Sequence, residues 1–305
     1  MLHVDDGASD ALLALLQHDD FLILTRRFPC VALAGRIAPP LSAALQEAGC
    51  QVIDEEIVLR AEHLSEHMLA PQHVWIAGSW YLAPPAKPVG NQAASRALAL
   101  QLVQLVSADA DTREIEAVLR RDPALSYHLL RLVNSLGMGL NREITSFAQA
   151  ILILGRAQLR RWLNLMLFSA RSGDDRSPML LARVATRARL MELLARTSGM
   201  DKSGQESAFM AGMFSLLGKL FGMPLDEVLR PLKISAALQS AVLRHEGEIG
   251  KLLALAEAAE RGDLPALAAG LDTLPLTTAE FNLLLVQTHL WMLDVVQESA
   301  GGAHA

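Results

Sequence analysis

The chain has 305 residues, of which 51% are hydrophobic and only 5% aromatic, and it carries a formal net charge of −6 at pH 7. This length allows a substantial core and about two domains, and the abundance of Leu and Ala favours helix over strand. The negative charge argues against a nucleic-acid-binding protein, which needs a basic face to displace counterions from phosphates.

The cysteines and the N-terminus indicate a cytoplasmic protein. Cys30 and Cys50 are the only cysteines, too few for a disulfide framework or a thiolate zinc site, and we expect two reduced thiols. The first ten residues are acidic where an export signal would be basic and then apolar. The longest apolar stretches, such as 281–293, fall short of the roughly 20 residues that span a bilayer, so no membrane segment is expected.

Residues 1–90 have the pattern of an α/β unit. Four apolar runs predict parallel strands covered by helices, at 21–25, 30–34, 51–54 and 73–78. Between the second and third runs, residues 38–49 predict a helix that begins at prolines and ends at a glycine. The proline-rich segment 81–92 breaks regular structure and predicts the domain boundary.

Residues 91–298 have helical periodicity throughout and predict an all-α domain, followed by a disordered tail at 299–305. Asp122 and Pro123 have the residue types of a helix start, and the apolar stripe after them ends at Gly137. Capping boxes are predicted at two further helix starts, Ser146 with Gln149 and Thr277 with Glu280.

A family resemblance rests on the middle of the chain. The run from Asp122-Pro123 through Asn134-Ser135 to ITSFAQAILILG (144–155) resembles the HDOD domain, and residues 93–298 fit that family or its C-terminal extension. The resemblance implies an all-helical output module of bacterial signalling proteins, structurally related to the HD phosphohydrolases.

The first part also carries a resemblance. GCQVIDEEIV (49–58) and WIAGSWYLAPPAKP (75–88) resemble the end of an EAL domain, the cyclic-di-GMP phosphodiesterase barrel, and VDDGAS (4–9) is similar to its DDFG motif. The start of such a barrel, with the EAL triplet, is missing. The implied architecture is a truncated, degenerate EAL-like half-barrel followed by an all-helical HDOD domain.

The metal-ligand residues that both resemblances imply are missing from the matching positions of this sequence. HD phosphohydrolases hold metal with an adjacent His-Asp pair, and here the matching residues are Ser215 and Leu216. The helix at 180–195, where another ligand would sit, contains no histidine. We therefore expect no metal, no other cofactor and no enzyme, while Gly212 and Gly218 indicate that the helix packing is retained.

In the EAL-like half, Glu55 matches one motif carboxylate, but Val58 and Ala77 stand where a Glu and a Gln are expected. Asp6 and Glu55 are the candidates for a residual EAL-like site. The alternative for these carboxylates is solvated side chains on loops.

An interaction patch is predicted on the helical domain. Four arginines near the family signature could bind an acidic partner or nucleotide phosphates, namely Arg131, Arg156, Arg160 and Arg161. Unrelated arginines scattered over helix surfaces are the alternative. His63 and His67 have a metal-compatible spacing, but we expect exposed side chains there.

The sequence favours a non-enzymatic signal-transduction protein whose HDOD domain is a scaffold for protein partners and whose EAL-like half is regulatory. One alternative is a sensor that binds cyclic-di-GMP without hydrolysing it, and another is a residual metal-dependent phosphohydrolase. The oligomeric state is left open. We expect the N-terminal half to pack on the helical domain, because an open half-barrel would expose sheet edges.

Overall fold

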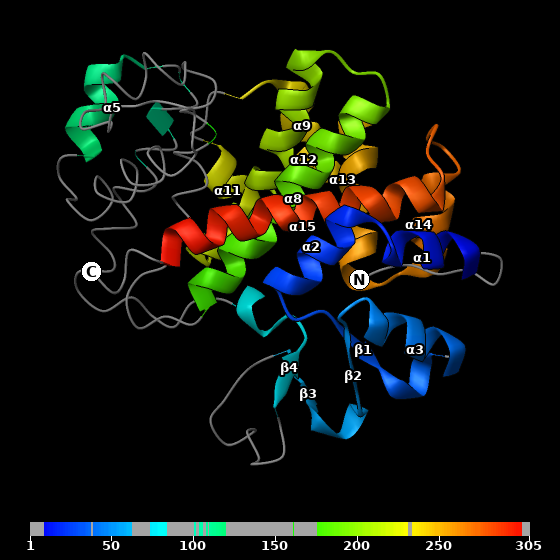
Figure 1. Cartoon of the computed structure of the whole chain (residues 1–305). Helices are drawn as coiled ribbons and strands as arrows, with labels where there is room; N and C mark the ends of the chain where they lie inside the picture. Colours follow the sequence, from blue (N-terminus) through cyan, green and yellow to red (C-terminus); the bar gives the residue numbers. More distant parts are fainter. Residues whose placement is uncertain are drawn as a thin grey trace, which may run out of the picture.

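The protein is mainly helical in the residues that the computed structural model describes (Figure 1). These residues are 9–37, 39–62, 74–83, 101, 104–105, 108, 110–119, 161, 176–230 and 234–300. No helix in this part of the chain is both long and apolar enough to cross a membrane. The helix-rich class predicted from composition is confirmed here.

The N-terminal part combines short helices with short parallel strands. Its elements are α1 (Ser9–Leu16), α2 (Asp19–Arg27), β1 (Val31–Leu33), η1 (Ala34–Arg36), α3 (Pro39–Glu47), β2 (Gln51–Ile53), η2 (Glu55–Ile57), β3 (Val58–Arg60), β4 (Trp75–Ala77) and η4 (Trp80–Leu82). β1 pairs with β2, and β3 with β4, each time in parallel. The strands predicted at 30–34, 51–54 and 73–78 and the helix predicted at 38–49 are confirmed; β3 has no counterpart among the predictions.

The strand predicted at 21–25 is wrong, because these residues lie in helix α2. The signals around the run are those of a helix: His18 accepts a hydrogen bond from the Asp20 N–H, acidic residues occupy the first turn and arginines the last. Phe21 and Leu24, three positions apart, are the buried side chains. The apolar run was too short for periodicity to separate a strand from a helix.

The strands do not form the single sheet that a half-barrel requires. Among the described residues they make two separate two-stranded sheets, and no closed barrel is present. Only η2 and Asp54 separate β2 from β3, whereas parallel neighbours need a crossover of about a dozen residues or more. β3 therefore cannot pair in parallel with β2 and instead begins a second pair with β4.

The remaining elements are helices. They are α5 (Thr112–Leu119), α8 (Arg176–Thr197), α9 (Lys202–Phe214), α10 (Leu217–Phe221), α11 (Leu225–Leu229), α12 (Ala236–Arg244), α13 (Gly247–Arg261), α14 (Leu264–Leu271) and α15 (Thr278–Ala300). α8 contacts α9, α13 and α15, and it lies at the centre of the helices in Figure 1. Val184, Ala188 and Met191 on this helix are fully buried, as expected for a core helix with apolar residues on most of its surface.

The N-terminal part packs on the helical part, as expected from the sequence. Helices α1 and α2 contact α15, and η4 contacts α8. Arg27 Nη2 lies 2.6 Å from Asp294 Oδ1 on α15. Leu12 and Phe21 belong to the same apolar cluster as the core of the helical part, so the two parts share one core.

The predicted capping box at the start of α15 is confirmed. Glu280 N–H donates to Thr277 Oγ1 at 3.2 Å, and Thr277 N–H donates to Glu280 Oε2 at 2.8 Å. This exchange satisfies two backbone donors that a helix start leaves unpaired.

Gly212→Ala should destabilise the protein. A Cβ at Gly212 would lie 2.7 Å from Ala188 Cα, so α8 and α9 would have to separate. We expect the overpacking, which costs about 1–3 kcal/mol, to outweigh the roughly 0.5–1 kcal/mol by which Ala exceeds Gly in helix propensity. Urea denaturation measures the net change, and Gly35→Ala is the matched control because no atom lies within 4 Å of its Cβ position. Equal stabilities of the two variants would contradict the close helix contact.

Candidate functional site

The residues at the expected His-Asp positions lie where α9 ends and α10 begins. Ser215 is the C-cap of α9, and its hydroxyl donates to the Gly212 carbonyl at 2.7 Å. The same oxygen accepts a hydrogen bond of 2.8 Å from Arg187 Nη1. Leu216 is 3% exposed and packs in the core. The pair position therefore presents one hydroxyl and one apolar side chain.

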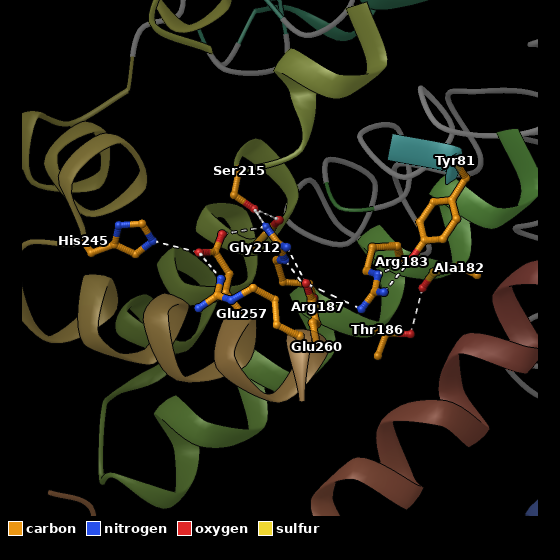
Figure 2. A network of polar contacts seen from close by, with 11 residues as sticks. Tyr81, Ala182, Arg183, Thr186, Arg187, Gly212, Ser215, His245, Glu257 and Glu260 are labelled. Carbon is orange, nitrogen blue, oxygen red and sulfur yellow. Dashed lines mark hydrogen bonds and ion pairs between the residues drawn. The ribbon is translucent and has the colours of Figure 1, made fainter. Parts of the chain in front are cut away.

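Arg187 projects from the middle of α8 into the space between α9 and α13 (Figure 2). Its side chain is 7% exposed. Its Nε donates to Glu260 Oε1 at 2.9 Å, its Nη2 bonds Glu260 Oε2, and its Nη1 lies 3.0 Å from Glu257 Oε1. Two parallel hydrogen bonds to Glu260 make this a bidentate pair, the strongest geometry for arginine and carboxylate.

The charge on Arg187 is held in place by these carboxylates. Burial opposes the charged form, but Glu260 and Glu257 outweigh burial and raise the pKa of the guanidinium. Arg187 is thus a permanent internal cation, with two carboxylates and the Ser215 hydroxyl as its partners.

The contacts continue on both sides of Arg187. Glu257 Oε2 lies 3.0 Å from His245 Nε2, at the end of α12. Glu260 lies 3.6 Å from Arg183 Nη1, and Arg183 Nε donates to the Tyr81 hydroxyl at 2.8 Å. We call these seven residues the Arg187 network: Tyr81, Arg183, Arg187, Ser215, His245, Glu257 and Glu260.

The Arg187 network connects the two parts of the protein. Tyr81 lies in η4 of the N-terminal part and is 5% exposed. Its hydroxyl accepts hydrogen bonds from Arg183 on α8, one turn from Arg187. A path of direct polar contacts therefore runs from η4 to Ser215 (Figure 2).

The donor set does not fit a metal ion. In the described part of the chain, no group of three or more His, Cys, Asp or Glu side chains is placed to hold one. A divalent cation near Glu257 and Glu260 would also be repelled by Arg187, which contacts both carboxylate oxygens of Glu260 and one of Glu257.

The network also lacks an activated nucleophile. Ser215 directs its proton to a backbone carbonyl, and Arg187, which donates to its oxygen, is a cation that cannot act as a base. The arrangement is therefore suited to fixing helices relative to one another.

The predicted EAL-like residues are not brought together with this site. Glu55 begins η2 and pairs with Arg60 Nη2 at 2.6 Å, with both side chains 53% exposed. Its neighbours Asp54 and Glu56 are also exposed. Asp6 lies outside the described residues, as do His63 and His67.

Of the predicted arginine patch, the structure describes Arg161 alone. Its side chain is 12% exposed, its Nη2 lies 2.6 Å from Glu192 Oε2, and its guanidinium stacks 3.8 Å from the Phe209 ring centroid. These contacts leave little of Arg161 for a partner. Arg131, Arg156 and Arg160 lie outside the described residues.

Sequence reasoning missed the Arg187 network, although it leaves a signal. Arg183 and Arg187 are one turn apart in a helix with many apolar residues, and Glu257 and Glu260 are three positions apart in another such helix. Charged pairs on the apolar faces of two core helices indicate mutual partners, since buried charges need compensation.

Comparison with known proteins finds a family match in the middle of the chain. Residues 94–244 match the family model of the HDOD domain. The chain is 30% identical over 200 residues to "Cyclic di-GMP phosphodiesterase CdgJ" of Vibrio cholerae, covering 65% of this chain and 46% of that protein. It is 29% identical over 161 residues to the protein YuxH of Bacillus subtilis, covering 52% of this chain and 39% of YuxH.

The chain therefore spans less than half the length of these relatives. A solved structure from Shewanella amazonensis aligns over 66% of this chain and 93% of its own, with 17% identity and a TM-score of 0.46. That similarity is too low to support an argument about function.

Replacing Arg187 with alanine should destabilise the protein by about 3–5 kcal/mol, because two carboxylates would lose the cation that compensates them. The side chain of Glu260 is 11% exposed and that of Glu257 is 22% exposed. Urea denaturation tests this, with Arg244→Ala as control; Arg244 pairs with Glu246 at the surface, both more than half exposed, and should have no measurable effect. A similar small effect for both variants would show that the buried pair is not required.

Proposed function

Since the chain carries an HDOD domain over residues 94–244, we propose that it is a non-enzymatic signal-transduction protein in which this domain is a module for binding protein partners. The observation that carries the proposal is the contact of Arg187 with Ser215. The position that the resemblance assigns to a metal-binding pair faces a protein cation instead.

The argument is one of charge and ligand chemistry. Metal-assisted hydrolysis needs lone pairs around a divalent ion, so that bound water can be activated. Here Leu216 offers none, and the nearby carboxylates of Glu257 and Glu260 are used by Arg187. A residual phosphohydrolase would require ligands at other positions, and we rank that alternative last.

The N-terminal part, in this proposal, is a degenerate EAL-like remnant with a regulatory role. The parallel unit of β1, α3 and β2 and the sequence motifs at 49–58 and 75–88 support this origin. The separation of the strands into two sheets speaks against a preserved barrel surface. Regulation would act through contacts such as Tyr81 with Arg183 rather than through catalysis.

A second candidate function is binding of cyclic-di-GMP without hydrolysis. It is favoured by the name of the Vibrio cholerae relative, which aligns with 65% of this chain. Of the two candidate EAL-like residues, the structure describes Glu55, and its exposed pair with Arg60 provides no enclosed site. We therefore rank this sensor below the interaction module.

The deciding experiment is a calorimetric titration of cyclic-di-GMP into the protein with magnesium and manganese, together with metal analysis of the purified protein. We expect no turnover and no stoichiometric transition metal, because the ligand positions are lost. Saturable heat would support the sensor. Stoichiometric metal, or hydrolysis that Ser215→Ala abolishes, would overturn the proposal.

The regulatory route predicts coupling between the two parts of the protein. Tyr81→Phe removes only the hydroxyl that Arg183 contacts, and Ser215→Ala removes the hydroxyl at the far side of Arg187. Their effects on unfolding free energy should deviate from additivity by about 0.5 kcal/mol or more.

The control cycle combines Tyr81→Phe with Thr277→Ala, which removes the cap of α15 outside the Arg187 network. Its effects should add within about 0.3 kcal/mol. If the effects add equally well in both cycles, the Arg187 network does not couple Tyr81 to Ser215.

A further inference from the structure

Cys30 and Cys50 lie at neighbouring positions in the β1–β2 pair. The strand register aligns Val31 with Gln51, and continuing it by one residue places Cys30 opposite Cys50. The Gln51 N–H donates to the Cys30 carbonyl at 2.8 Å, which extends the hydrogen bonding of the strands to this level. Neither cysteine is in a disulfide.

The backbone around Cys50 is fixed by the end of helix α3. The Cys50 N–H donates to Leu45 O at 2.9 Å, and the Gly49 N–H donates to Gln46 O at 3.0 Å. Gly49 has a φ of 89°, the left-handed conformation that often ends a helix. The position of Cys50 beside β1 is therefore set by both helix and strand contacts.

This placement meets the geometric requirement for a disulfide. Neighbouring strands lie about 4.8 Å apart, and side chains at aligned positions of parallel strands leave the same face of the sheet. Disulfides join residues whose Cα atoms are about 4.4–6.8 Å apart. The strand register therefore places the two cysteines at positions whose spacing suits a disulfide.

We propose that Cys30 and Cys50 are a redox modification site, and that they form an intrachain disulfide when the protein meets a low-molecular-weight disulfide oxidant. This inference is independent of the proposed function, because it uses no residue of the Arg187 network.

The reaction proceeds by thiol–disulfide exchange. Cys30 is the more exposed of the two, since Cys50 is only 9% exposed. The Cys30 thiolate attacks the oxidant, forming a mixed disulfide and releasing one small thiol. The Cys50 thiolate then attacks the Cys30 sulfur and releases the second. Two protein thiols are oxidised, and one disulfide is reduced to two thiols, which take up the two protons.

Burial sets the speed of this reaction. Desolvation raises the pKa of Cys30, and desolvation together with the neighbouring Cys30 raises the pKa of Cys50 to about 11. Both thiols are therefore protonated near neutral pH, and only the thiolate is nucleophilic. As long as the pH stays below these pKa values, the rate should rise about tenfold for each unit by which the pH is increased.

The test is oxidation of the full-length folded protein with oxidised glutathione at neutral and at alkaline pH, followed by peptide mapping without reductant. We expect a crosslinked peptide pair containing Cys30 and Cys50 and faster formation at the higher pH. The crosslink closes a loop of about 20 residues and restricts the unfolded chain. The oxidised protein should therefore unfold at a higher temperature, and dithiothreitol should reverse the shift.

Single-cysteine variants distinguish the steps. Cys50→Ser should stop at the glutathione adduct on Cys30, whereas Cys30→Ser should react much more slowly because its remaining thiol is buried. The proposal is overturned if the folded wild-type protein keeps both thiols free at alkaline pH. It is equally overturned if oxidation gives only crosslinks between molecules, or gives the intrachain bond only in denaturant.

Discussion

The buried charge of Arg187 is the constraint on which the arrangement of the helical part depends. A guanidinium that is 7% exposed must find anionic partners, and it finds them 70 and 73 residues further along the chain, at Glu257 and Glu260. Such a pair adds little net stability compared with apolar packing, but losing one partner is costly. The pair therefore fixes how α8 and α13 meet, since any shift between them would leave a charge uncompensated.

The close approach of α8 and α9 brings Ser215 into this arrangement. Gly212, one turn before Ser215, lies against the backbone of Ala188, where a Cβ would meet Ala188 Cα at 2.7 Å. The hydroxyl of Ser215 thereby comes within 2.8 Å of Arg187. One small residue and one internal cation thus give three helices a fixed meeting point, at the position where the resemblance leads one to expect a His-Asp pair.

Local signals in the sequence predicted what depends on local structure. The sequence predicted the capping box at Thr277 and Glu280, because a cap depends on residues three positions apart. It also predicted the strands at 31–33 and 51–53, because each is a short apolar run next to the signals of a helix. The run at 21–25 was assigned to a strand from its apolar residues alone, although the acidic residues before it and the arginines after it are the signals of a helix.

The Arg187 network could not be predicted as a site, because its pairings span far more of the chain than any periodicity. Ser215 and Leu216 could be singled out as a changed pair, but the cation that faces them is visible only in three dimensions. The sequence shows that Arg183 and Arg187 lie one turn apart among the apolar residues of one helix. It does not show which carboxylates compensate them.

The junction at Tyr81 has a different physical character from the buried ion pair. Its hydroxyl is a neutral group that accepts hydrogen bonds from Arg183, and such bonds contribute about 1.5–3 kcal/mol when one partner is charged. Water can replace a neutral acceptor far more easily than it can replace Glu260 at Arg187. The contact of η4 with Arg183 is therefore easier to exchange for water than the pair of Arg187 with Glu260, while α1 and α2 pack on α15. A displacement of η4 would change the surroundings of Arg183 while the contacts of Arg187 with Glu257 and Glu260 could remain in place.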